Sequence, residues 1–194
     1  MKTVNIYTDG ACAGNQEERN IGGWGSVLEY RGREKELHGG EIDTTNNRME
    51  LTALIEALSV LREDGLRLRI FSDSSYLVNC FRRKWYVSWQ KNGWRNSKKQ
   101  PVENRELWEK LLGLLEGNRA EFYLVKGHQK LLEGGEESNS IAYRRFTENN
   151  GPGFSYDEFE KIVEYNNRCD ALANVFISEQ RGSLISEQKE LPWD

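Results

Sequence analysis

The stretch VNIYTDG, from Val4 to Gly10, predicts the first element of the fold. Its side chains alternate with the two-residue period of a β-strand, and the glycine marks the end of the strand. The residue just before that glycine is Asp9, a carboxylate at the end of an apolar segment. A second segment, RIFSD, reaches Asp73 in the same way. Two strands that both end on an acid are unusual, because a carboxylate is costly to remove from water.

The segments that follow these strands predict a mixed sheet packed against helices. A Gly-rich start and an Arg31–Gly32 turn favour a hairpin, and leucines at helical spacing after Asn46 favour a helix. The expected further strands are 21–30, 34–42, 66–72 and 122–125, and the expected helices are 46–61, 74–89, 104–116 and 157–180. Paired glycines with Ser, Asn and Pro predict a flexible loop over 133–153. This order is typical of an α/β layer fold.

Length and composition place the chain among globular proteins. Its 194 residues suffice for one domain with a full core, and no apolar run is long enough to span a bilayer. The first ten residues are interpreted as a strand rather than a signal peptide. The three cysteines are odd in number and widely spaced, which favours free thiols in a reducing compartment. We therefore expect a cytoplasmic protein without a membrane partner.

Four acids form the candidate site: Asp9, Glu50, Asp73 and Asp170. If the two acid-ended strands are parallel neighbours, their carboxylates emerge at the same edge of the sheet, where α/β sheets bind ligands. Glu50 shares a helix face with Ala53 and Leu54, the side that a sheet would cover. Each acid alone has an ordinary explanation, such as a helix cap or a first-turn charge. Together they need a divalent cation, and oxygen-only ligands favour Mg²⁺ or Mn²⁺ over zinc.

A basic stretch lies between Phe81 and Gln100, although the net charge of the chain is −4. It holds seven Lys and Arg residues and no acid, interleaved with Trp85, Trp89 and Trp94. A local patch of this kind suits a polyanion better than the net charge suggests. Because Trp85 and Trp89 are four residues apart, we also expect at least one of them to pack into the core.

The motifs TDGACAGN, TTNNRMEL, FSDSSY, the basic tryptophan stretch, VKGH and NRCDALA occur in this order. In this the chain resembles type 1 ribonuclease H, over its first 128 residues and again over 166–173. The resemblance implies a mixed five-stranded sheet with helices on both faces. It implies an endonuclease that cuts the RNA strand of RNA–DNA hybrids and leaves 5′-phosphate and 3′-hydroxyl ends. The four acids would be catalytic and would hold Mg²⁺ or Mn²⁺, as two ions in the substrate complex.

The same resemblance assigns further positions. His128, which alone would be an ordinary surface-loop histidine, matches a mobile-loop residue associated with proton transfer and product release. Trp85 and Tyr76 would pack against the DNA strand, and Lys91, Arg95, Lys98 and Lys99 would supply electrostatic attraction. Thr45, Ser97 and Asn104 match positions that bind a DNA phosphate, but Asp43 stands where relatives are often basic. The positions that would read the minor groove and the 2′-hydroxyls are Cys12, Gly14, Asn15, Asn46 and Asn47.

The match is interrupted between His128 and Asp170, which are separated by 41 residues. We expect one catalytic domain over 1–180 with an inserted segment at about 129–165, followed by a polar tail over 181–194. The inserted segment could be a surface excursion without a role, a lid that controls product exit, or a partner-binding element. It also makes the position of Asp170 less secure, with Asp157 as the alternative acid.

Two other functions stay open at this point. Acidic clusters recur in resolvase and integrase cores, so the fold alone does not decide between nucleases. A non-catalytic hybrid-binding module would also use the basic stretch. The TTNNRMEL block and the tryptophan-rich stretch favour the hybrid-cutting enzyme over other nucleases, and the intact carboxylates argue against the binding module. Because the first predicted strand starts within a few residues of Met1, we expect no hybrid-binding module ahead of it. We also expect a free-standing, monomeric enzyme of bacterial or phage type.

Overall fold

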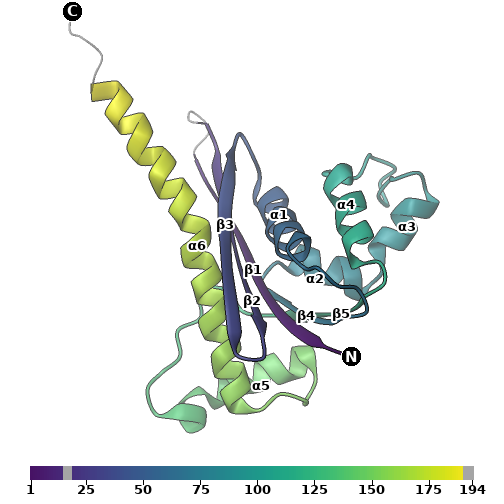
Figure 1. The fold of residues 1–194 in the computed structure, drawn as a ribbon, viewed down its shortest axis with the longest axis vertical. Coiled ribbons are helices and arrows are strands. Elements are labelled where there is room, and N and C mark those ends of the chain that lie inside the picture. The colour runs from purple at the N-terminus through teal and green to yellow at the C-terminus, as the bar shows by residue number, and fades with distance from the viewer. Residues whose placement is uncertain (15–18, 190–194) are drawn as a thin grey trace, which may run out of the picture.

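The computed structural model describes residues 1–14 and 19–189, and within them a five-stranded mixed sheet (Figure 1). The strand order is β3-β2-β1-β4-β5, in which β1 pairs antiparallel with β2, β2 antiparallel with β3, and β4 parallel with both β1 and β5. The strands are β1 Thr3–Ala13, β2 Ile21–Tyr30, β3 Arg33–Ile42, β4 Arg67–Ser72 and β5 Arg119–Leu124. This confirms the predicted fold class.

Helices cover both faces of the sheet, as expected (Figure 1). The helices α1, α2, α3 and α4 lie on one face, and the long helix α6 crosses the other, with α5 beside its first turns. Their bounds are α1 Asn46–Ser59, α2 Ser75–Arg82, α3 Trp85–Lys91, α4 Arg105–Leu115, α5 Gly135–Asn150 and α6 Tyr156–Lys189. None of the helices in the described ranges combines the length and the apolar character that crossing a bilayer requires.

The core between the sheet and α1 follows from the sequence pattern. The Thr45 hydroxyl caps α1 by accepting a hydrogen bond from the backbone N–H of Arg48 at 3.3 Å. Leu51, Leu54 and Leu58 then recur on one face of the helix and are fully or almost fully buried against the sheet. The capping and the apolar stripe together determine where α1 begins and which side it presents to the strands.

The opposite face of the sheet carries a second, mainly aromatic core. Tyr7 and Phe71 stack at 4.9 Å between ring centroids, and Phe71 also contacts Phe154 at 6.3 Å. Phe146 of α5 and Phe159 of α6 complete this cluster, and both are buried. Because these residues come from the segment 129–165, that segment is part of the core. The interpretation as a surface excursion is therefore wrong.

Several predicted boundaries differ from the structure. The expected flexible loop over 133–153 is mostly the helix α5, and the expected helix over 74–89 is two helices, separated where Lys84 adopts a left-handed backbone with φ 54°. The first strand continues to Ala13 because β2 pairs with it beyond Gly10. Helix α6 is continuous and extends into the polar tail as far as Lys189, and residues 190–194 lie outside the described ranges.

Candidate active site

The parallel pairing of β1 with β4 brings two acids together. Tyr7 lies opposite Phe71 and Thr8 opposite Ser72, so that Asp9 and Asp73 follow at the same level of adjacent strands. Since β4 ends at Ser72, Asp73 leaves the sheet there while β1 continues. This confirms the prediction that both carboxylates emerge at the same edge of the sheet.

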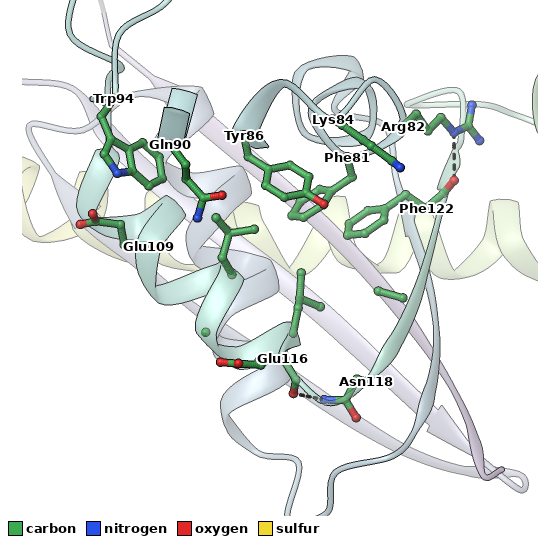
Figure 2. Close-up of a pocket in the computed structure, with 14 residues that line it drawn as sticks. Phe81, Arg82, Lys84, Tyr86, Gln90, Trp94, Glu109, Glu116, Asn118 and Phe122 are labelled. Atoms are coloured by element: carbon green, nitrogen blue, oxygen red, sulfur yellow. Dashed lines mark hydrogen bonds between the residues drawn. The ribbon is translucent and has the colours of Figure 1, made fainter. Parts of the chain in front are cut away.

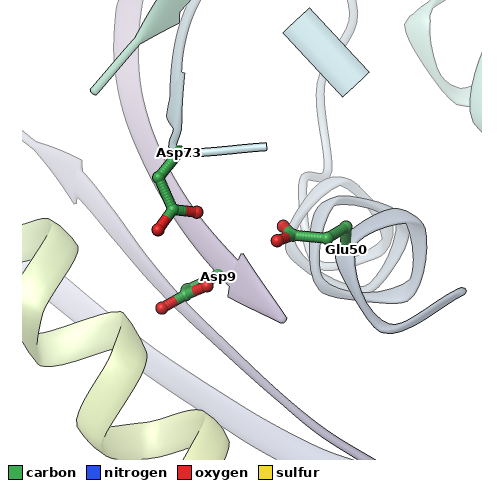
Figure 3. A group of neighbouring side chains, drawn as sticks. All are labelled: Asp9, Glu50 and Asp73. Atoms are coloured by element: carbon green, nitrogen blue, oxygen red, sulfur yellow. The ribbon is translucent and has the colours of Figure 1, made fainter. Parts of the chain in front are cut away.

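A close contact between β1 and α1 places the third acid. A methyl group on Gly10 would lie 2.4 Å from the backbone nitrogen of Glu50, a distance that no side chain tolerates. The glycine thus lets the helix backbone rest directly on the strand beside Asp9. Glu50 points from α1 toward the two aspartates, as Figure 3 shows. It is only 3% exposed, so the charge does lie on the covered side of the helix.

The three acids form a compact group in which each offers an oxygen within 4.8 Å of the others' (Figure 3). The Glu50 Oε2 atom is buried and has no hydrogen-bond partner among the described residues. Burial, and then the charges of Asp73 and Asp170, raise the pKa of Asp9 to about 8. Burial also raises the pKa of Glu50 and Asp73. An unpartnered carboxylate oxygen among mutually repelling acids fits a hard divalent cation.

Asp170 lies beside this group rather than within it. It lines the same cavity, of about 490 Å³, as Asp9, Glu50 and Asp73, and its Oδ2 is 3.3 Å from Nδ1 of His128. The backbone of α6 comes close to β2 at Gly25, where a methyl group would lie 2.2 Å from the carbonyl oxygen of Cys169. Asp157 is exposed and does not line the cavity. The structure therefore supports Asp170, and not Asp157, as the fourth acid near the site.

Other residues of the cavity were partly foreseen. Cys12, Asn46, Asn47 and Tyr76, all expected to contact substrate, line it. Ser74, Ser75 and Asn174 line it as well and were not singled out from the sequence. The Asn174 amide donates to the Asp170 backbone carbonyl at 2.8 Å and to its Oδ1 at 3.1 Å. Its position one helical turn after Asp170 was the available signal.

The basic stretch forms a protrusion built on α3. Trp89 is buried, which confirms that at least one tryptophan packs into the core, whereas Trp85 is half-buried with its ring 6.4 Å from that of Tyr76. The residues expected to attract the hybrid electrostatically are all exposed: Lys91, Arg95, Lys98 and Lys99. Ser97, expected to bind a DNA phosphate, is exposed in the same stretch. A hydrogen bond links the two ends of the loop 95–99, because Arg95 Nη1 donates to the Lys99 backbone carbonyl at 2.8 Å.

The proposed DNA-phosphate positions lie at helix starts. Thr45 is exposed at the start of α1, and Asn104 precedes α4 with a left-handed φ of 55°. Asp43 stands at the position where relatives often have a basic residue, and it forms an ion pair with Arg19 at 2.6 Å. The arginine offsets that negative charge beside Thr45. Of the turn that follows β1, Gly14 is described, whereas Asn15 lies outside the described residues.

A larger cavity of about 820 Å³ lies elsewhere, between α2, α3, α4 and β5 (Figure 2). Its floor includes Phe81 and Phe122, whose rings stack at 4.0 Å, and Arg82 donates to the Phe122 carbonyl at 3.0 Å. The carboxylates at its edge are Glu109 and Glu116, which belong to no metal-binding group among the described residues. Size alone therefore does not identify the site; the buried acids do.

Fold and site together define a class: an α/β protein with a group of largely buried carboxylates where the parallel pairing of its two central strands ends. Comparison with known proteins specifies the family. The family model "RNase H" matches residues 1–146, and the chain belongs to the ribonuclease H family. The structure resembles that of LC9-RNase H1, described as a type 1 RNase H with the type 2 active-site motif, with a TM-score of 0.58 and 28% identity over 85% of each chain.

Curated relatives called ribonuclease H agree with this assignment. The one from Moorella thermoacetica is 54% identical over 128 residues, which is 66% of this chain and 82% of the relative. The one from Clostridium botulinum strain Hall is 42% identical over 179 residues, which is 92% of this chain and 98% of the relative. Because it extends over 92% of this chain, that alignment reaches beyond the first 128 residues and into the segment 129–165.

Proposed function

We propose that this chain is an endonuclease that hydrolyses the RNA strand of RNA–DNA hybrids at the cavity formed by Asp9, Glu50, Asp73 and Asp170. The observation that best supports this proposal is the group of three largely buried acids, in which one Glu50 oxygen has no hydrogen-bond partner among the described residues. Its membership of the ribonuclease H family supports the choice of substrate. The resolvase, integrase and binding-module alternatives have no comparable support.

Each acid has a distinct task in this proposal. Asp9 lies on the central strand beside Glu50 and Asp73, and would hold a divalent cation together with them. When bound, Mg²⁺ or Mn²⁺ supplies a deprotonated water as nucleophile and neutralises charge on the phosphate and the leaving 3′ oxygen. Two ions in the substrate complex would divide these roles. The backbone of Glu50 is held where α1 rests on β1 at Gly10, and Asp73 directly follows the paired strand β4. Both carboxylates would therefore stay in position to bind a cation.

In this proposal His128 would move a proton at the open side of the site. Its side chain is 77% exposed and lies 3.3 Å from Asp170, so it can reach both the acid and solvent. An imidazole in that position can donate a proton to the leaving 3′ oxygen and then exchange protons with water. The products would be a 5′-phosphate and a 3′-hydroxyl end.

The DNA strand would lie toward the protrusion. Trp85 and Tyr76 present a half-buried aromatic surface, and the four cations Lys91, Arg95, Lys98 and Lys99 are exposed on the protrusion. Thr45, Asn104 and Ser97 would contact a DNA phosphate, with Arg19 offsetting Asp43. Asn46 and Asn47 line the catalytic cavity and can both donate and accept hydrogen bonds, as reading a 2′-hydroxyl requires.

A cleavage panel tests this proposal. Labelled RNA–DNA hybrid, RNA duplex, DNA duplex and four-way junction are incubated with Mg²⁺ or Mn²⁺ and with the wild type, Asp73→Asn or Asp157→Asn. We expect cutting of the hybrid alone, a loss on the order of 1,000-fold in Asp73→Asn because several kcal/mol of charge stabilisation disappear, and unchanged cutting in Asp157→Asn. Junction cutting without hybrid cutting, or tight hybrid binding without any cleavage, would refute the proposal.

A further inference from the structure

A second cavity continues from the catalytic one. It measures about 730 Å³ and lies between the loop after β5 and helix α5. Asp73, Ser75 and His128 line both this cavity and the catalytic one, so that the two are contiguous. A nucleic-acid strand bound at the acids can therefore continue into the second cavity while it stays on the protein surface. We call this second cavity the α5 groove.

The α5 groove is positively charged. Lys126, Lys130 and Arg145 line it and are exposed, and none of the three makes an ion pair within the described ranges. Asp73 is the sole acidic residue among those that line it. The glutamates of the same segment, such as Glu136 and Glu148, lie outside it. Three unpaired cations beside a phosphate-cleaving site create a field that attracts a polyanion.

The groove is built on a fixed frame. Asn139 is buried, donates to the Leu132 carbonyl at 2.9 Å and accepts from the Leu132 N–H at 2.8 Å, which ties the loop to α5. Asn167 of α6 donates to the Gln129 carbonyl at 2.9 Å. Phe146 anchors α5 in the aromatic core. These contacts fix the loop and the helix that carry the cations, so the backbone of the groove need not be ordered when a ligand binds.

We propose that the α5 groove binds the phosphate backbone of the RNA strand on one side of the cleaved bond. This rests on the proposed function. The strand whose phosphate lies at Asp73 and His128 is the one being cut, whereas the aromatic surface assigned to the DNA strand is at Trp85. Two exposed apolar residues at the groove, Leu132 and Ile141, are 65% and 59% exposed and suit contact with sugar edges.

Adjacent arginines on α5 provide a matched test. Arg145 lines the groove, whereas Arg144 does not and faces Glu148 at 3.8 Å. Affinity is measured with Ca²⁺ for wild type, Lys130→Gln/Arg145→Gln and Arg144→Gln, over a range of salt. Three hybrids are compared: one long, one shortened on the 5′ side of a single cleavable site, and one shortened on its 3′ side. Melting temperatures check that each variant is folded.

We expect wild type and Arg144→Gln to lose affinity, roughly 10-fold, when one of the two sides is shortened. The double variant, which keeps Lys126, should lose clearly less affinity on that shortening, and its salt slope should be lower by about two. An unchanged slope and an unchanged response to shortening in the double variant would overturn the inference. Cutting of the short hybrid by the double variant with Mg²⁺ would in that case leave the proposed function standing, whereas a wild type that cuts no hybrid would refute the function itself.

Discussion

At the scale of single residues, the site is a balance between burial and charge. Asp9 is 5% and Glu50 is 3% exposed, and neither has a cationic side chain as a partner among the described residues. Each acid is therefore destabilising in its charged form when no cation is bound. The protein thus keeps an unfavourable burial of charge at the edge of the sheet, where a substrate phosphate would bind in the proposed function. Burial, and then the neighbouring acids, accordingly raise the pKa of Asp9 and Glu50, so the protein's stability should depend on pH.

The raised pKa of Asp9 gives a prediction with a definite sign. In the unfolded chain Asp9 loses its proton near its ordinary pKa of 3.8, whereas in the folded chain it keeps the proton up to a pKa of about 8. The folded state binds more protons between these values, so the free energy of unfolding should fall as pH rises from 4 to 8. Melting temperatures in EDTA should show this decline, and Mg²⁺ should raise the melting temperature more at the upper end of that range than at the lower end.

Asp9→Asn should flatten that pH dependence, because an amide does not titrate. Asp157→Asn is the control, since that exposed acid lies away from the cavity. An Asp9→Asn protein whose melting temperature declines with pH as steeply as the wild type's would assign the effect to other groups.

Gly10 carries a second prediction at this scale. In Gly10→Ala the new methyl group would lie 2.4 Å from the Glu50 nitrogen and 2.7 Å from the Met49 carbonyl carbon, so α1 must shift. We expect a loss of about 1–3 kcal/mol in the free energy of unfolding by urea, together with lower cleavage. Gly113→Ala is the control, because Gly113 lies in α4 with open space around it and should be neutral or stabilising. Equal stability of the two variants would contradict the close-packing account.

At the scale of elements, the two cores differ in how well the sequence predicts them. The α1 core could be predicted because its leucines recur at helical spacing behind a threonine cap. Helix α5 could not, because it starts at paired glycines and buries only Asn139 and Phe146. Tertiary contacts with α6 and the sheet stabilise it despite this pattern. The break between α2 and α3 was equally hidden, since Lys84 takes a left-handed backbone without glycine or proline.

If α5 and α6 form a core, truncating a central ring should be costly. Phe159 is 1% exposed and contacts Phe146 at 5.2 Å and Tyr143 at 5.5 Å between ring centroids. Phe159→Ala should lower the free energy of unfolding by about 3–5 kcal/mol, measured by urea denaturation. The exposed Ile141→Ala on α5 should change it by less than about 0.5 kcal/mol. A small effect of Phe159→Ala would return the segment to the status of a loosely attached excursion.

At the scale of the whole molecule, a net charge of −4 conceals a divided surface. Acids converge at one edge of the sheet, while cations project from the α3 protrusion and line the α5 groove. The acids of the site could be predicted from the sequence because Asp9 and Asp73 follow apolar segments and Glu50 faces the packing side of a helix. The α5 groove could not, since Lys130 and Arg145 meet only through the fold. The place of Asp170 likewise depends on how closely α6 approaches Gly25.

The divided surface predicts how salt affects binding. Lys98 and Lys99 are exposed on the protrusion, far along the chain from the acids. If they neutralise DNA phosphates, Lys98→Gln/Lys99→Gln should weaken hybrid binding and reduce the slope of log affinity against log salt by about one unit for each phosphate that is no longer neutralised. The control is Arg33→Gln/Lys35→Gln, which removes the same charge from the exposed start of β3. If both pairs lower the slope equally, binding responds to overall charge and not to the protrusion; if neither does, these lysines form only a solvated surface.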